Sequence, residues 1–263
     1  STFQGTLFRP SGNPILDLQG PSHLDAISQR RQLDLLAQLN QRHLDERPGG
    51  RELAARIETY ELAYRMQSET PEAVDLSKET QATQNQYGIG MQPTDEYGRN
   101  CLIARRLVER GVRFIQLYSG GGHLEDTWDG HESIEKNHGL HGAEVDQPIA
   151  ALLTDLEQRG LLESTLVVWG GEFGRMPFSE GRDAPGRNHN PYGFSMWMAG
   201  GGVKGGMSFG ETDEFGFQAM VDKTHVHDIH ATILHLMGID HEDLSYFHQG
   251  RQETLTDVHG RVI

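Results

Sequence analysis

The sequence predicts an α/β fold built on a largely parallel sheet that helices cover on both faces. Three apolar, β-rich runs support this prediction, at residues 112–118, 165–169 and 194–199, and each run stops at a glycine turn. Segments with the apolar spacing of amphipathic helices alternate with these runs. This alternation is typical of parallel sheets whose strands are buried on both sides.

The first part of the chain is predicted to be helical. Ser28 is expected to cap a helix that runs to about Leu44 and stops at the Pro-Gly-Gly of residues 48–50. A second helix is expected over residues 53–64, where apolar side chains recur on one helical face. Both helices have a polar opposite face, so each is expected to lie on a larger body.

Residues 77–93 are polar, rich in Gln and Thr, and are interpreted as a connection. The chain is therefore expected to divide into residues 1–93, a helical and loop segment packed on the core, and residues 94–263, which form the α/β core. In the core, helices are predicted over residues 95–110, in a segment that ends at Gly160, and from about Asp228 to Gly238.

Composition excludes several classes of protein. The 263 residues carry 23 Lys and Arg against 38 Asp and Glu, a formal charge of −15 that opposes binding to nucleic acid. The single cysteine, Cys101, cannot form an internal disulfide and is expected to be a buried structural thiol. No stretch approaches the roughly 18 apolar residues of a membrane span. The chain begins without Met or a targeting signal, which suggests a processed chain or a fragment.

Histidine is the unusual component, because 12 of the 14 histidines lie after residue 120. Polar residues follow two of the predicted strands directly, at the sheet edge where α/β folds bind ligands. The candidates are Asp129, His131, Glu172, Arg175, Arg187 and His189. Carboxylates with imidazoles suit Zn, Mn or Fe-type ions, and arginines suit a phosphate or sulfate group.

Each candidate also has a simpler interpretation. An Asp-x-His in a loop is often a turn-capping Asp beside a solvated His, as Asp129 and His131 would then be. Glu172 can accept hydrogen bonds from its glycine-rich turn, and His189 can lie exposed in a polar loop. Their joint occurrence at strand ends favours a site.

A second histidine cluster lies at residues 225–230. Asp228 is a candidate N-cap of the helix that follows, since an acidic residue suits a helix N-terminus. His227, Asp228 and His230 are therefore candidate ligands of second rank, with packing or supporting roles as the alternative.

Several strings of the sequence resemble the family called domain of unknown function 1501 (DUF1501). They are residues 98–102, 105–114, 128–131, 165–175, 188–192, 198–206 and 227–234. That family is grouped with alkaline phosphatases and sulfatases, which hydrolyse phosphate or sulfate esters at metal centres. The resemblance implies an alkaline phosphatase-like core with a mostly parallel sheet.

The resemblance also implies ligand positions. Glu172-Phe173-Gly174 falls where phosphatases and sulfatases have Asp-His-Gly or Asp-Asn-Gly, and His189 falls where phosphatases have a further metal histidine. Asp129 and His131 resemble a metal-binding Asp/His pair further upstream.

Two departures from the pattern matter. Phe173 replaces the second residue of the Asp-His dyad, which argues against a full two-metal site. The first metal-binding Asp and the nucleophile position have no counterpart, so the chain is expected to be the C-terminal part of a longer protein, with an incomplete core and the N-terminal remainder as a partner. Relatives are often exported, which suggests an exported or periplasmic protein.

The leading hypothesis is a sulfatase-like, metal-dependent hydrolase of an anionic small-molecule or glycan ester. Asp129, His131, Glu172 and His189 would hold a divalent ion such as Zn, Mn or Ca, and Arg175 and Arg187 would hold the ester, whereas the nucleophile is unassigned. The alternative is a non-catalytic metal-binding or scaffold relative that has lost the two-metal site. A third interpretation leaves the histidines as solvated loop residues.

Overall fold

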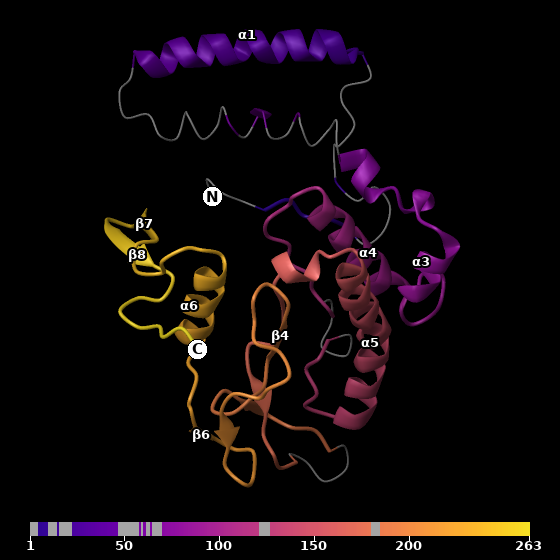
Figure 1. Cartoon of the computed structure of the whole chain (residues 1–263), viewed down its shortest axis with the longest axis vertical. Coiled ribbons are helices and arrows are strands. Elements are labelled where there is room, and N and C mark those ends of the chain that lie inside the picture. Colours follow the sequence, from indigo (N-terminus) through magenta and orange to yellow (C-terminus); the bar gives the residue numbers. More distant parts are fainter. Residues whose placement is uncertain are drawn as a thin grey trace. The chain divides into compact units, whose positions relative to one another are not determined.

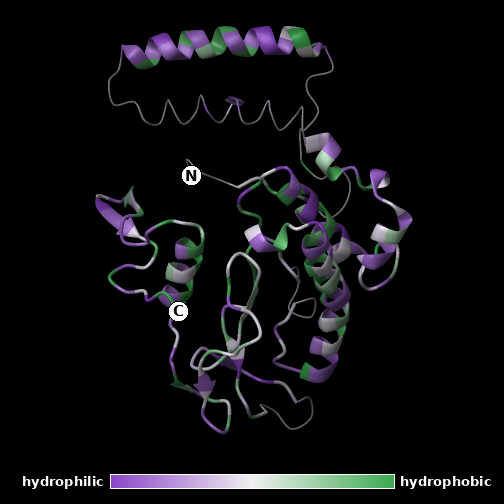
Figure 2. Ribbon diagram, viewed as in Figure 1, coloured by the Kyte–Doolittle hydropathy of each residue, from purple (hydrophilic) through white to green (hydrophobic). Residues whose placement is uncertain are grey.

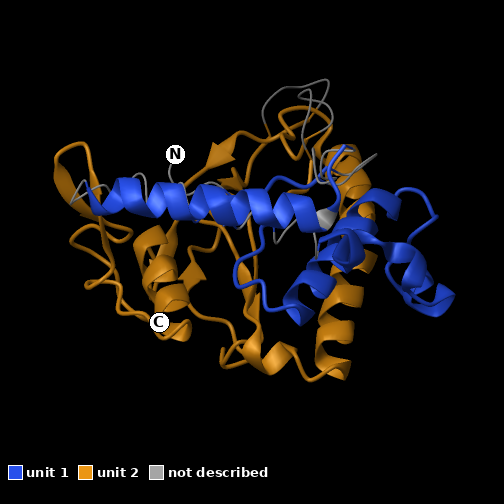
Figure 3. Ribbon diagram, turned by 90° about the horizontal axis from the view of Figure 1, so that it is seen from above, with its two compact units in different colours: residues 1–117 blue, residues 118–263 orange. Residues whose placement is uncertain are grey.

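The computed structural model describes residues 5–9, 15, 23–46, 58, 60, 61, 64, 70–120, 127–179 and 185–263. The chain forms two compact units, residues 1–117 and residues 118–263, which Figure 3 shows in different colours. Each unit is a body of its own, and the predicted domain boundary after residue 93 stays a prediction.

In the first unit, helix α1 spans Ala26–Asp45 and confirms the predicted N-terminal helix. Its N-cap is Asp25 rather than Ser28, because the Asp25 carboxylate accepts a hydrogen bond from the Ser28 amide at 2.8 Å. Apolar residues recur among polar ones along α1 (Figure 2), yet Leu36 and Leu39 are half exposed. The predicted helix over residues 53–64 lies almost wholly outside the described residues.

The segment interpreted as a connection contains two short helices instead. A 3-10 helix, η1, spans Leu76–Lys78, and helix α3 spans Gln81–Gln86. Asp75 and Thr80 cap them, each accepting a hydrogen bond from a backbone amide two or three residues further on. Local capping thus gives helical structure to a polar segment that lacks an apolar periodicity.

Helix α4 spans Asp95–Glu109 and confirms the predicted helix over residues 95–110. Cys101 is fully buried, as expected, and burial raises the pKa of its thiol to about 12. Two further buried side chains of this helix, Arg105 and Arg106, both pair with Glu79. Burial acts to raise the pKa of Glu79, but the two guanidinium groups outweigh it and hold that pKa below its usual value.

In the second unit, helix α5 spans Ile134–Gln158, and the 3-10 helix η3 spans Leu162–Ser164 (Figure 1). Val145, Leu152 and Leu156 are buried on one face of α5, as their spacing predicts. The helix is followed by Gly160 with φ +66°, the left-handed conformation in which glycine commonly ends a helix.

Among the described residues of the second unit, the strands are short and pair only two by two, in antiparallel orientation. Each pair is a small hairpin or ribbon of its own. The pairs are β1 (Val167–Trp169) with β4 (Trp197–Ala199), β2 (Gly174–Arg175) with β3 (His189–Asn190), β5 (Glu211–Thr212) with β6 (Ala219–Val221), and β7 (Ser245–His248) with β8 (Arg251–Thr254).

The predicted α/β fold, a mostly parallel sheet sandwiched by helices, is therefore wrong, and an alkaline phosphatase-like core is not found. Parallel pairing needs a crossover, usually a helix, between the two strands. The described part of residues 170–196, between β1 and β4, contains β2 and β3 but no helix, so Val168 pairs antiparallel with Met198. Val168 and Trp169 are also more than a third exposed, which excludes a sheet covered on both faces.

Residues 112–118, the first predicted strand, form no strand in the structure. Phe114 and Tyr118 are 72% and 70% exposed, so this run is not buried between layers. β-branched and aromatic side chains favour an extended, pleated segment, but they do not determine whether another strand is available to pair with it.

Helix α6 spans Val226–Leu236 and precedes Gly238, close to the prediction. Its N-cap is His225, whereas Asp228 stands three residues later and accepts a hydrogen bond from the His225 amide at 2.8 Å. The other oxygen of Asp228 accepts one from the Arg261 amide at 2.8 Å, so it also fastens the C-terminal segment. None of the helices in the described part of the chain has the length and apolar character needed to cross a membrane.

Candidate metal centre

Three segments of the second unit meet at one place: the loop before α5, strand β2 and strand β3. The antiparallel register of β2 and β3 places Arg175 opposite His189. Two backbone hydrogen bonds join the loop to the segment before β3, from the Arg187 amide to the Gly130 carbonyl at 2.9 Å and from the Ile134 amide to the Pro185 carbonyl at 3.2 Å. These contacts, between residues more than 50 positions apart, assemble the site.

Gly186 lies between these two hydrogen bonds and has no room for a side chain. A Cβ at this position would overlap the carbonyl group of His131 and lie 2.5 Å from the Glu132 amide nitrogen. The close backbone approach therefore requires glycine.

The segments bring Asp129, His131 and His189 together. Each offers one ligand atom, and the three atoms lie within 4.8 Å of one another. Asp129 Oδ1 is 2.7 Å from His131 Nδ1 and 3.2 Å from His189 Nε2. Two ligands at about 2.0–2.2 Å from one tetrahedral ion lie about 3.3–3.6 Å apart, so the three atoms are close to a ligand arrangement.

Asp129 also forms an ion pair with Arg175. Arg175 Nη2 lies 2.8 Å from Asp129 Oδ1 and 3.1 Å from the Trp128 carbonyl oxygen, and Arg175 Nη1 donates to the Arg187 carbonyl at 3.0 Å. Burial acts to raise the pKa of Asp129, but the hydrogen bonds from Arg175 and His189 and the neighbouring positive charges outweigh it. The pKa of Asp129 is therefore lowered, which keeps the carboxylate ionised and able to bind a metal.

Phe173 packs against the His189 ring, with the ring centroids 3.9 Å apart and the planes 28° from parallel. This contact fixes the orientation of the imidazole. The Phe173 ring offers no metal-ligand atom on this side of His189.

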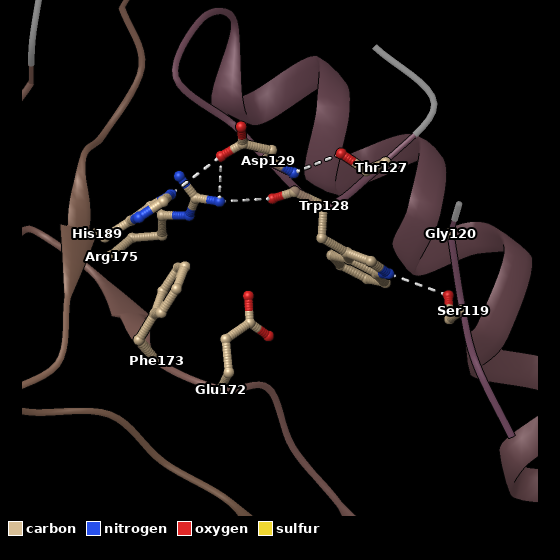
Figure 4. A pocket seen from close by; sticks show the side chains of 9 residues that line it. All are labelled: Ser119, Gly120, Thr127, Trp128, Asp129, Glu172, Phe173, Arg175 and His189. Atoms are coloured by element: carbon tan, nitrogen blue, oxygen red, sulfur yellow. Dashed lines mark hydrogen bonds and ion pairs between the residues drawn. The ribbon is translucent and has the colours of Figure 1, made fainter. Parts of the chain in front are cut away.

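A pocket of about 410 Å³ opens beside the group, between Trp128, Phe173 and His189 (Figure 4). Glu172 lines this pocket with its exposed side chain, but its carboxylate is not part of the convergent group. Its place among the ligands stays a prediction. Arg187 is exposed and contributes its backbone to the site.

Residues behind the ligands hold the loop in place. The Trp128 indole donates to Ser119 Oγ at 3.0 Å, and its ring packs against His138 and His141 of α5, with centroids 5.4 and 5.3 Å away. His141 is 3% exposed and its Nδ1 lies 2.8 Å from Glu144 Oε2. The pKa of His138 is lowered by burial and by the charges of nearby groups.

Sequence reasoning missed this supporting layer. His138 and His141 are three residues apart, and this spacing places both on one helical face. A helix beginning at Ile134 would have predicted that both rings face the same neighbour, but the sequence prediction covered only the later turns of α5.

The second histidine cluster is arranged differently. His227 lies beside His225 and His259, with ring centroids 4.6 and 5.8 Å away, whereas His230 is exposed. Asp228 is engaged by the two backbone amides described above. Across the part of the chain that the structure describes, Asp129, His131 and His189 alone bring three ligand atoms together, so ligand roles for His227, Asp228 and His230 stay predictions.

The sequence matches, over residues 1–263, the family model described as "Protein of unknown function (DUF1501)". The chain belongs to this family. No curated protein and no solved structure matches this DUF1501 chain. The family match does not extend to alkaline phosphatases and sulfatases, and that wider relationship is not confirmed.

Proposed function

We propose that this DUF1501 protein is a metal-dependent hydrolase of an anionic ester, with Asp129, His131 and His189 as ligands of one divalent ion. The observation that carries the proposal is the convergence of one carboxylate and two imidazoles at the rim of an open pocket. Three protein ligands leave coordination positions for water or substrate, as in catalytic zinc sites.

The donor set also bears on the identity of the ion. Ca²⁺ prefers six to eight oxygen ligands, whereas imidazole nitrogens suit Zn²⁺ and other transition metals. Two of the three ligands are imidazoles, so Zn²⁺ or Mn²⁺ fits better than Ca²⁺. When bound, such an ion polarises an ester oxygen or acidifies a water molecule.

The other pocket residues then have distinct roles. Arg175, which lines the pocket, supplies positive charge for a phosphate or sulfate group, and the exposed Arg187 beside it is a second candidate for this role. The rings of Phe173 and Trp128 supply apolar contact to the bound ester. Glu172 is either a fourth ligand, as the sequence predicts, or the acceptor of the proton from the attacking water. Glu172→Gln separates these roles. If Glu172 is a ligand, the variant loses metal; if it accepts the proton, the variant loses turnover at unchanged metal content.

The test measures metal content and turnover together. The wild-type protein, Asp129→Asn and His189→Ala are loaded with Zn²⁺ or Mn²⁺, desalted and assayed against aryl phosphates and aryl sulfates. We expect about one ion per wild-type chain, chelator-sensitive turnover and loss of both in the two variants. His248→Ala, which removes an exposed histidine of β7, is the matched control and should retain both. Wild-type metal content in Asp129→Asn and His189→Ala would refute the proposal.

A non-catalytic metal-binding protein is the second candidate. It is favoured because the ring of Phe173, which offers no ligand or proton-transfer group, lies against His189, and because no nucleophile is assigned. Stoichiometric metal that the ligand variants remove, together with no turnover of phosphates or sulfates, would support this second function.

A further inference from the structure

One oxygen of Asp129 serves three cationic or hydrogen-bonding partners at once. Oδ1 lies 2.7 Å from His131 Nδ1, 2.8 Å from Arg175 Nη2 and 3.2 Å from His189 Nε2. The two imidazole nitrogens are the proposed ligand atoms. The guanidinium therefore contacts the carboxylate oxygen that faces the proposed metal position.

A guanidinium and a divalent ion cannot both make full use of this oxygen. The guanidinium is always charged, donates to the oxygen lone pairs and repels a second cation a few ångströms away. The carboxylate, in turn, is neutralised by whichever cation binds it. Among the described residues, the other hydrogen bonds of the guanidinium go to two neutral carbonyl oxygens, of Trp128 and Arg187, and its carbon Cζ lies 5.9 Å from the Phe173 ring centroid.

We propose that Arg175 and the metal compete for Asp129, and that metal binding releases the Arg175 guanidinium to bind the anionic group of the ligand. This inference rests on the proposed metal centre. Arg175 is only 16% exposed while it is paired with Asp129, so it is a poor anion receptor until that pair is broken. Arg175 thereby makes binding ordered, with the metal first and the anion second.

The competition predicts an increase in metal affinity when Arg175 is removed. Arg175→Gln keeps hydrogen-bond donors for the two carbonyl groups and removes the charge. Titration calorimetry with Zn²⁺ alone should show binding about tenfold tighter than wild type, because a charge-assisted hydrogen bond no longer has to be broken. Arg251→Gln removes the same charge from an exposed position outside the pocket lining and should change Zn²⁺ affinity less than about twofold.

Arg175→Gln should have the opposite effect on anion affinity, because the variant lacks the guanidinium that would bind the anion. Inorganic phosphate should bind the Zn²⁺-loaded wild type at least about tenfold more tightly than Zn²⁺-loaded Arg175→Gln. By linkage, phosphate should tighten Zn²⁺ binding by the factor by which Zn²⁺ tightens phosphate binding.

A measurement on the wild-type protein covers the case in which Arg175→Gln does not fold. An arginine-selective dicarbonyl reagent is applied, and the modified peptides are quantified by mass spectrometry. Zn²⁺ should increase the modification rate of Arg175 severalfold, and phosphate added with Zn²⁺ should suppress it. The rate at Arg251, which is 79% exposed, is the internal control and should not change.

The outcomes separate this inference from the proposed function. If Asp129→Asn and His189→Ala leave Zn²⁺ binding unchanged, the metal centre itself is refuted. If those variants abolish binding but Arg175→Gln binds Zn²⁺ as weakly as or more weakly than wild type, Arg175 only positions the loop and the competition is refuted. An Arg175 modification rate that Zn²⁺ leaves unchanged refutes the release in the same way.

Discussion

Gly186→Ala tests whether the close contact between two loops assembles the metal centre. The Cβ of alanine would overlap the His131 carbonyl group and approach the Glu132 amide nitrogen to 2.5 Å, whereas real Cβ contacts essentially never fall below 3.0 Å. Because the obstructing atoms are backbone, no side-chain rotation can relieve the overlap. The loop and the segment before β3 must therefore move apart.

The cost of this separation follows from the contacts on either side of Gly186. The hydrogen bonds from the Arg187 amide and from the Ile134 amide would both lengthen, at about 0.5–1.5 kcal/mol each. Steric strain adds about 1–3 kcal/mol if the backbone cannot separate fully. We expect the free energy of unfolding to fall by about 2–6 kcal/mol in total.

Gly186→Ala should lower the metal affinity as well as the stability of the fold. Ligand distances in metal sites hold to about 0.2 Å, so separation of His131 from His189 by even half an ångström disrupts the site. We expect Zn²⁺ affinity to fall at least about a hundredfold, a loss that corresponds to about 2.7 kcal/mol.

The assay combines urea unfolding with calorimetric Zn²⁺ titration of the same preparations. Gly142→Ala is the matched control, because its Cβ meets nothing within 4 Å and alanine favours the helix α5 in which it lies. That control should bind Zn²⁺ as the wild type does and be slightly more stable. If Gly186→Ala matched the wild type in both measurements, the two loops would not meet as described.

Three further predictions concern the surroundings of the site. Asn190→Ala, next to His189, should lower the free energy of unfolding by about 2–4 kcal/mol, because the buried Asn190 side chain donates a hydrogen bond to the Phe217 carbonyl at 3.0 Å and accepts one from the Tyr192 backbone amide at 3.1 Å. An unchanged urea midpoint would contradict this prediction. Trp128→Phe should cost about 0.5–1.5 kcal/mol by loss of the indole hydrogen bond and leave Zn²⁺ affinity within about threefold, so a large affinity loss by calorimetry would count against a supporting role. Burial acts to raise the pKa of Asp228, but two backbone amides and nearby positive charge lower it below 3.8, so its stabilisation is present above pH 3.8 and is lost as pH falls further. Asp228→Asn should therefore lose less stability at about pH 3 than at about pH 6, and an equal loss at both values in urea titrations would refute the linkage.

The helices show how much of the fold could be predicted from the sequence. The periodicity of apolar residues located α1, α4, α5 and α6 to within a few residues, except for the first turns of α5. Helical hydrogen bonds join residues four positions apart, so the information that specifies a helix is local. The caps were less well predicted: Asp25 and His225, not Ser28 and Asp228, occupy the N-cap positions.

The pairing of the strands, in contrast, could not be predicted from the sequence. The apolar runs at residues 165–169 and 194–199 were recognised as strands, but their direction of pairing was not, because a strand does not encode its partner. The run at residues 112–118 has equal β character and pairs with nothing in the described part of the chain.

The candidate site combines both kinds of information. Asp129, His131 and His189 were nominated by their side-chain chemistry, by their positions near the ends of predicted strands and by the family resemblance, because spacing alone is weak evidence for a site. Only the tertiary structure decided that these three residues converge and that Arg175 contacts Asp129. It also decided that Phe173 covers His189 and that Gly186 permits the loops to meet. These contacts join residues up to about 60 positions apart in the chain, and their geometry depends on long-range packing that no local pattern of residues specifies.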